Sequence, residues 1–554
     1  MWMRVASACL FVILSLATAC SGDRAVKPGP ATECAAGVGT PIALVGGGYL
    51  AVDPATNSGC VRFAVNSSAS ESTEYLVVPQ SAAGTSGQSS PFELRGGAAA
   101  AIAATRTAPF TSRMGTAAVA FDLFLRRLAR TRDYLRVPST SAGSVASRSA
   151  TPVVAGPPVL GSLRSFKVCA TRTCSSLQTV IARARIVGAH IAIYIDTLAP
   201  AAGLDSADLD TLKQDFDTRL YPLDTAAFGG VSDIDSNSVA IVLMTGAVNA
   251  LVTRTECRTT GFIAGFFFGA DLDPAFAAQY NHGEVFYSIV ADPDSTLSCA
   301  HSAGQVKLLT PLTFTHEFQH MISFVQHVLV RGGEPEEGWL DEGLSKYAEE
   351  LAARSYLPGD PVRFSRYAVE DLYDGYQYLA APGASALLIP QDNGTLANVG
   401  ASWLFTRYLV DQFGDSLPRK LHQTALVGAA NVAAQTGQPF TTLVTRWALA
   451  NWVSDLPGFS PGPELQYSSW HFRTTYASLN SQDPGDFPQP FPLVPAAGAG
   501  GAVNISGTLR PGSGVFQRVF QAPGGAGFTL SFTANGTTLI PTAVVPRLGI
   551  IRIR

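Results

Sequence analysis

Two histidines lie four residues apart in an apolar segment, and this pair constrains the chain more than any other feature. The segment Leu309–Leu329 reads LTPLTFTHEFQHMISFVQHVL. Its composition predicts a helix buried on most sides, with Thr310 as the cap and Pro311 in the first position. One helical turn separates His316 from His320, so the two imidazoles face the same way. Zinc needs that geometry to take two nitrogen ligands from one helix.

Two glutamates complete the set that a catalytic metal site requires. Glu317 follows the first histidine and is placed to accept a proton from metal-activated water. The segment Gly338–Leu351 reads GWLDEGLSKYAEEL and predicts a second helix, on which Glu342 supplies a third ligand. Catalytic zinc takes three protein ligands and keeps one position open. The turn at 331–333 lets the two helices run antiparallel and share one metal. The alternative is a buried helix whose histidines are simply hydrogen-bonded.

Several short segments carry a resemblance to a known family. HEFQH, followed after 21 residues by the glutamate of WLDEGLS, resembles the gluzincin clan of zinc peptidases. The segments DIDSN (233–237), GFFFGADL (265–272) and HEFQHMI are most similar to the hyicolysin-like M30 family of bacterial metallopeptidases. The resemblance covers roughly residues 161–453.

The resemblance implies zinc at His316, His320 and Glu342, with Glu317 as the general base. It also implies an α+β, zincin-like domain in which a mixed sheet lies over the active-site helix, followed by a helical subdomain. WLDEGLSKYAE is also similar to the M1 aminopeptidases, but their GxMEN segment, which reads a free amino terminus, is absent. We therefore expect an endopeptidase acting on protein or peptide substrates. Two alternatives stay open: a surface lipoprotein that uses a peptidase-like domain only for binding, and a zinc hydrolase acting on a non-peptide bond.

The surroundings of the metal are less defined by the sequence. Glu349 lies two turns after Glu342 and is the candidate to accept the free N–H of a ligand histidine, with Asp341 and Glu350 as competitors. The M1 enzymes stabilise the oxyanion with a tyrosine before a glycine in a later helix, but the matching segment 398–400 reads Asn-Val-Gly. The candidate substitutes are Tyr408, Tyr378 and Tyr347.

The DIDSN segment spaces oxygen-bearing side chains at alternate positions, as a calcium loop does. An EF-hand is excluded, because Ser238 stands at the sixth place and Met244 at the twelfth. We favour a turn in which the side chains cap backbone groups. Calcium at Asp233, Asp235 and Asn237 is the alternative.

The first twenty residues have the pattern of an export signal. Arg4 precedes the apolar stretch Val5–Ala17, which is too short to span a bilayer. Leu-Ala-Thr-Ala-Cys at 16–20 resembles a bacterial lipobox. This implies cleavage after Ala19, lipidation of Cys20 and a lipoprotein anchored on the periplasmic or extracellular side of a membrane. The alternative is cleavage that leaves Cys20 unmodified.

Cysteine usage agrees with an exported protein, and the charge bears on its partners. Proximity in the sequence favours three disulfides, Cys34–Cys60, Cys169–Cys174 and Cys257–Cys299, which an oxidising compartment permits. The net charge is −4 and no long run of either sign occurs, so we expect no nucleic-acid partner.

The pattern of elements predicts several domains. Strand-like runs at 190–196, 239–245 and 285–291 alternate with a helix at 206–220, which is typical of an α/β or α+β arrangement. A helix with an arginine cluster at 126–132 is interpreted as an ordinary basic face, with a processing site as the alternative. The predicted division is a signal peptide at 1–19, a tether at 20–40, a β-rich domain with a helix at 41–137, a linker at 138–159, the metallopeptidase domain at 160–480, a linker at 481–501 and a β module at 502–554.

Overall fold

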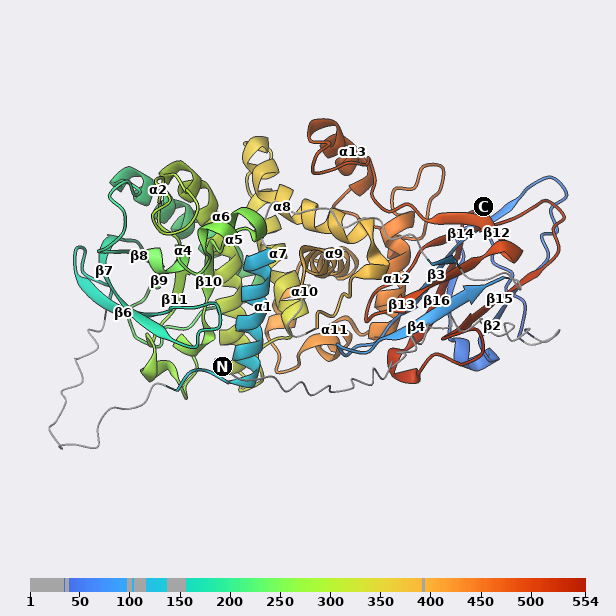
Figure 1. Ribbon diagram of the computed structural model, residues 1–554, viewed down its shortest axis with the longest axis horizontal. Helices are drawn as coiled ribbons and strands as arrows, with labels where there is room; N and C mark the ends of the chain where they lie inside the picture. Colours follow the sequence, from blue (N-terminus) through green and yellow to red (C-terminus); the bar gives the residue numbers. More distant parts are fainter. Residues whose placement is uncertain (1–33, 35–38, 97–101, 104–115, 137–155, 391–393) are drawn as a thin grey trace, which may run out of the picture.

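The computed structural model describes Cys34 and residues 39–96, 102–103, 116–136, 156–390 and 394–554. The protein is mixed α and β, with a six-stranded sheet, a helical region and two five-stranded sheets (Figure 1). The predicted signal peptide, Cys20 and most of the tether and of the 138–159 linker lie outside the described residues. Within these ranges, no helix is both long enough and apolar enough to cross a bilayer.

The six-stranded mixed sheet forms one wall of the site. Its order is β10-β11-β9-β8-β7-β6, with β11, β9 and β8 parallel and the others antiparallel to their neighbours. The strands are β6 (Leu163–Cys169), β7 (Leu177–Val187), β8 (Ile191–Asp196), β9 (Ala240–Met244), β10 (Gly265–Phe267) and β11 (Val285–Ser288). The parallel strands are the three predicted runs, and their continuous apolar sequences fit strands covered on both faces.

Helices pack against this sheet, and the longest of them is α6 (Ala303–Phe324). The others are α2 (Ser206–Asp215), α3 (Tyr221–Phe228), α4 (Gly246–Asn249) and α5 (Arg254–Thr260). The predicted start of α6 at Thr310 is wrong, because Ser302, eight residues earlier, forms a capping box with Gln305. Thr310 instead donates its hydroxyl to Val306 O at 2.6 Å, and Pro311 lies inside the helix, where it removes one backbone donor.

The helical region lies in the middle of the molecule, around α9 (Figure 1). Its helices are α7 (Gly338–Arg354), α8 (Pro361–Ala380), α9 (Leu396–Phe413), α10 (Leu417–His422), α11 (Gly428–Thr436), α12 (Phe440–Val453) and α13 (Phe472–Gln482). Two glycines let these helices approach closely. A Cβ on Gly343 of α7 would lie 2.7 Å from Ser402 O of α9, and one on Gly400 of α9 would overlap Asp374 O of α8.

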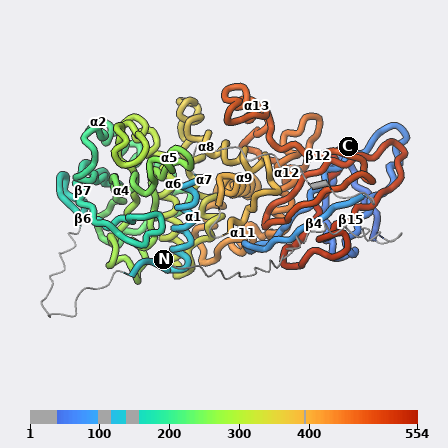
Figure 2. The backbone as a smooth tube through the Cα atoms, viewed as in Figure 1, coloured from blue at the N-terminus to red at the C-terminus, as the bar shows by residue number. Residues whose placement is uncertain are grey.

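The outer β regions form one structure, so the predicted separate domains at 41–137 and 502–554 are a wrong division. Strands from both ends of the chain pair in both sheets, as the mixed blue and red tube in Figure 2 shows. The first sheet is β1 (Tyr49–Val52), β16 (Pro546–Arg552), β3 (Thr73–Ser81), β14 (Gln517–Gln521) and β12 (Ala496–Ala499). The second is β2 (Cys60–Phe63), β15 (Phe528–Thr533), β4 (Ser90–Arg95), β13 (Asn504–Leu509) and β5 (Ile102–Ala103). The predicted 481–501 linker supplies edge strand β12.

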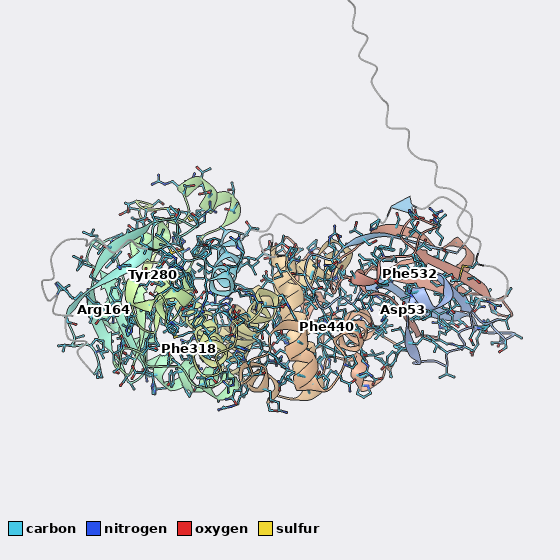
Figure 3. All side chains as sticks on the ribbon, turned by 90° about the horizontal axis from the view of Figure 1, so that it is seen from below. Asp53, Arg164, Tyr280, Phe318, Phe440 and Phe532 are labelled. Atoms are coloured by element: carbon cyan, nitrogen blue, oxygen red, sulfur yellow. A yellow bond between two sulfur atoms is a disulfide. The ribbon has the colours of Figure 1, made fainter. Side chains whose placement is uncertain are left out.

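Strand β3 joins these sheets to the helices, because it is buried on both faces. Tyr75 and Val77 belong to the core between the two sheets, whereas Leu76 and Val78 belong to the core that contains α12. Figure 3 shows Phe440 of α12 between the sheet marked by Phe532 and the helix marked by Phe318. The outer sheets are therefore packed firmly against the helical region.

The three predicted disulfides, Cys34–Cys60, Cys169–Cys174 and Cys257–Cys299, are confirmed. The predicted helix with the arginine cluster is α1 (Thr116–Thr131). It lies away from β4, on the side of the molecule with the six-stranded sheet (Figure 1). It contacts α7 and α9, next to the metal-ligand candidates (Figure 1).

Candidate metal centre

The three predicted zinc ligands converge at the junction of α6 and α7. His316 Nε2 and His320 Nε2 lie 3.2 Å apart. Glu342 places one carboxylate oxygen 3.7 Å from His316 Nε2 and the other 3.6 Å from His320 Nε2. The side chains of His320 and Glu342 are buried, and that of His316 is 12% exposed.

These separations fit a metal better than they fit hydrogen bonds. Ligands about 2.1 Å from a tetrahedral zinc lie roughly 3.4 Å from one another, close to the three distances observed. The 3.6 and 3.7 Å separations are too long for hydrogen bonds, and Glu342 Oε1 is buried without a partner. A divalent cation would satisfy this oxygen and both imidazole nitrogens together.

Both histidines are held by carboxylates on their other ring nitrogen. Glu349 Oε1 lies 2.6 Å from His316 Nδ1, which is the contact predicted for this glutamate. Asp341 Oδ2, one of the two competitors, lies 2.9 Å from His320 Nδ1. Each carboxylate fixes an Nδ1–H tautomer and so leaves Nε2 free to bind a metal.

The other competitor, Glu350, faces away from the metal centre. It accepts hydrogen bonds from Trp403 Nε1 and Trp470 Nε1 and pairs with Arg407 and Arg354. It therefore ties α7 to α9 and to the chain before α13. Although Glu349 and Glu350 are sequence neighbours, they lie about 100° apart around the helix axis and contact different groups.

Lys346 extends the network behind His316, a role that no motif in the sequence indicates. Its ammonium lies 3.3 Å from Glu349, 3.4 Å from Asp371 and 3.6 Å from Asp374. These carboxylates raise the pKa of Lys346 well above its usual range in spite of its burial. The lysine thus stays charged and keeps the Glu349 carboxylate oriented toward His316.

Glu317 lies against the edge strand of the sheet. Its Oε2 accepts a hydrogen bond of 2.7 Å from Phe267 N of β10. The Phe267 carbonyl is likewise directed outward from the sheet, since it accepts from Arg126 at 2.9 Å. The carboxylate is therefore fixed next to the metal ligands and beside an edge strand that has β11 on its other side only.

Carboxylates outnumber cations around this centre. Burial raises the pKa of Glu342 to about 7, and burial also raises the pKa values of Glu317 and Asp122. His316 has the opposite behaviour: burial lowers its pKa, but Glu349, Glu317 and Glu342 together raise it to about 9. Such a surplus of buried negative charge is the environment that a divalent cation stabilises.

Helix α1 brings a further carboxylate to the site, and no local sequence pattern indicates it. Asp122 offers an oxygen within 4.8 Å of ligand atoms of both His316 and Glu317. Arg126, one turn later, is buried and lies 3.7 Å from Asp341 as well as on Phe267 O. The interpretation of the arginine cluster as an exposed basic face is therefore wrong for Arg126.

A cavity of about 160 Å³ adjoins the metal ligands. Its walls come from α1, β10, α6, α7, α8 and α9, and they include Asp122, Gly265, Glu317, Lys346 and Tyr373.

None of the three predicted oxyanion tyrosines lines this cavity. Tyr408 donates to Glu464 O at 2.8 Å, Tyr378 stacks on Trp447, and Tyr347 packs on Phe228. All three tyrosines are buried in the apolar core of the helical region. Tyr373 of α8 is the tyrosine that lines the cavity, and it takes their place as the candidate.

The DIDSN segment forms the predicted turn, although the acidic cluster differs from the predicted one. Asp233 Oδ1 accepts from Asn237 N and Ser238 N, and Asn237 Oδ1 accepts from Val239 N. The amide oxygen of Asn237 is thus used by the backbone. Glu284, which precedes β11, comes within 4.8 Å of Asp233 and Asp235 in its place.

No protein-family model matches the chain, and no curated protein is significantly similar to it.

Proposed function

We propose that this protein is an exported zinc-dependent endopeptidase of the gluzincin type, with His316, His320 and Glu342 as metal ligands and Glu317 as general base. The observation that carries the proposal is the convergence of three ligand side chains, whose nearest atoms lie 3.2 to 3.7 Å apart, each histidine being backed by its own carboxylate. The mixed sheet over α6, followed by helices, supports a zincin-like domain. The resemblance to the hyicolysin-like M30 family supports the same assignment.

Each residue has a distinct task in this mechanism. Zinc, when bound, supplies Lewis acidity for the scissile carbonyl and lowers the pKa of water toward about 7. Glu317 accepts a proton from the attacking water and returns it to the leaving amine. Phe267 N holds the carboxylate in place for both transfers. The edge strand β10 binds the substrate as an extended chain through its outward Phe267 carbonyl. Tyr373 is the candidate donor to the oxyanion.

The three disulfides support export, since such bonds persist in oxidising compartments. We further propose that the mature chain begins at a lipidated Cys20, which anchors it to a membrane. Mass spectrometry of the mature amino terminus tests this directly, because a diacylated cysteine and a free one differ by the mass of the lipid.

Metal analysis combined with a casein assay tests the proposed chemistry. Wild type is expected to hold one zinc per chain, and His320→Ala none. Glu317→Gln should keep the zinc and lose about a hundredfold or more in cleavage rate, because a positioned base contributes that much. Glu71→Gln, an exposed change among the outer sheets, is the matched control and should leave both readouts unchanged.

Two outcomes would contradict the proposal. A wild-type chain without zinc, unaffected by chelator, would favour the binding-only lipoprotein. A chain that holds zinc but cleaves only esters or other non-peptide bonds in a substrate panel would favour a different hydrolase.

A further inference from the structure

Helix α1 lies in the cleft where the proposed substrate would bind. Ala118, Val119 and Asp122 form one wall of the cavity beside the metal ligands. The opposite walls belong to β10, α6 and α8, so α1 stands between the edge strand and the helical region. A polypeptide that pairs with β10 would meet α1.

Contacts on both sides hold α1 in this cleft. On the side of the sheet, Arg126 donates to Phe267 O and Arg132 pairs with Asp273 at 2.9 Å. On the other side, Arg130 donates at 2.6 Å to the carbonyl of Pro335, which precedes α7. The Phe267 carbonyl is an acceptor that an edge strand offers to an added strand. Arg126 therefore occupies a hydrogen-bonding position that a bound peptide would need.

Asp122 is the residue of α1 nearest to the metal centre. It is only 8% exposed, its Oδ1 is buried without a hydrogen-bond partner, and it approaches within 4.8 Å of ligand atoms of His316 and Glu317. A buried carboxylate without a partner is costly unless a cation balances it. Asp122 lines the same cavity as His316 and Glu342, where a divalent cation would supply that balance.

We infer that α1 is an internal occupant of the substrate cleft, anchored at the metal centre by Asp122, and that the conformation described is a closed, self-inhibited form. The inference rests on the proposed peptidase function. It assigns the arginines of α1 the role of docking contacts. It also assigns Asp122 a place among the groups that stabilise the bound metal.

The test uses the full chain loaded with cobalt in place of zinc and acetohydroxamate as the probe. Its binding is followed by the visible spectrum of the cobalt ion. Two variants loosen α1 in different ways: Arg130→Ala combined with Arg132→Ala removes contacts remote from the metal, and Asp122→Asn removes the anchor charge at constant shape. The matched control is Arg183→Ala on β7, which loses a hydrogen bond to Gly161 O.

Both loosened variants are expected to bind acetohydroxamate about tenfold more tightly than wild type. If α1 leaves the wild-type site open in about one molecule out of ten, the apparent affinity of wild type is about tenfold lower than that of an open site. Asp122→Asn should also lower cobalt affinity in competition with a chelator, whereas the double arginine variant should not. Equal hydroxamate affinity in all metal-loaded proteins would overturn the inference about α1 and leave the peptidase proposal standing. A wild-type chain that binds no metal would overturn the proposed function and this inference with it.

A second, independent observation concerns the acidic cluster near the far end of the six-stranded sheet. Asp233 and Asp235 precede β9, and Glu284 precedes β11, so the carboxylates meet where two neighbouring parallel strands begin. Figure 3 shows Arg164, the ion-pair partner of Asp235, toward this end of the molecule.

Two oxygens of this cluster have no partner. Asp235 Oδ2 accepts from Asn237 and Arg164, and Glu284 Oε1 accepts from Ser232 and Ile234 N. In contrast, Asp235 Oδ1 and Glu284 Oε2 are buried with no hydrogen bond, on side chains that are 7% and 1% exposed. The ion pair with Arg164 supplies one positive charge to this cluster of three carboxylates.

The geometry points to a site for a hard divalent cation of the calcium class at Asp233, Asp235 and Glu284, separate from the zinc centre. Equilibrium dialysis of radioactive calcium against the zinc-loaded chain should find one bound ion per molecule. Asp235→Asn combined with Glu284→Gln should lose it and keep the zinc, while Asp210→Asn, an exposed change on α2, should keep both. The inference would be overturned by calcium binding that is absent in wild type, or equal in the double variant.

Discussion

Replacing Gly343 by alanine should displace Glu342, a proposed metal ligand, without changing any side chain that is proposed to bind metal. Gly343 follows Glu342 on α7 and faces α9. An added Cβ would lie 2.5 Å from Thr406 Oγ1 and 2.7 Å from Ser402 O. Thr406 can rotate its hydroxyl away, but Ser402 O is backbone of a buried helix and cannot.

The expected size follows from these distances. An ordinary carbon–oxygen contact needs about 3.3 Å, so α7 must withdraw from α9 by roughly 0.6 Å. Metal–ligand distances tolerate about 0.2 Å. Glu342 moves with its helix, and zinc affinity should fall about 10- to 100-fold, as when the support of a ligand is lost. Overpacking of the helix contact should also reduce the free energy of unfolding by about 1–3 kcal/mol.

Zinc affinity is measured by competition with a chromogenic chelator, and stability by urea unfolding of the metal-free chain. Gly304→Ala in the first turn of α6 is the control, because its Cβ would meet nothing closer than 4.0 Å. Its zinc affinity should equal that of wild type. If Gly343→Ala also binds zinc like wild type, the placement of Glu342 does not depend on the close contact between α7 and α9, and the reasoning is refuted.

Further predictions concern the stability of the folded chain. Burial raises the pKa of Asp224 well above its usual range, so the folded chain binds a proton that the unfolded chain releases, and stability falls as pH rises above about 4. Asp224→Asn should therefore be about 1–3 kcal/mol more stable than wild type in urea at pH 8 and equal to it near pH 4, unlike the exposed Asp210→Asn. Leu548→Ala in β16 should cost about 2–5 kcal/mol, whereas the half-exposed Leu539→Ala should cost less than about 1 kcal/mol. Removing the metal with EDTA should lower the Tm, and one equivalent of zinc should restore it, as followed by calorimetry.

The convergence of His316, His320 and Glu342 could be predicted because its geometry is local. His316 and His320 share one helix, where a spacing of four residues fixes their directions. Glu342 and Glu349 share the next helix, and a carboxylate behind a ligand histidine is a general requirement. The parallel strands could be predicted for a similar reason, since a continuous apolar run is a property of the segment itself.

The remaining features depend on contacts between distant parts of the chain. Nothing in the sequence around Asp122 distinguishes a carboxylate that faces a metal centre from one on an exposed helix. The strands before Arg95 look like a small domain because their partners, such as β13 and β16, come at the other end of the sequence. The sequence predicts too late a start for α6, because Pro311 suits a first helical position, whereas the capping box at Ser302 begins the helix.

The pairing of the two chain ends bears on how α1 could leave the cleft. The strands before α1 are held in the outer sheets by β13, β14, β15 and β16, and the chain after α1 enters the six-stranded sheet at β6. A single cut on either side of α1 would therefore leave the helix attached to the folded protein through its other side. Release would need either two cuts or displacement of a helix that stays tethered. In the second case α1 competes with substrate at the effective concentration set by its tethers, and its contacts through Arg126, Arg130 and Arg132 decide the outcome. Loosening these contacts should then open the site without any proteolysis.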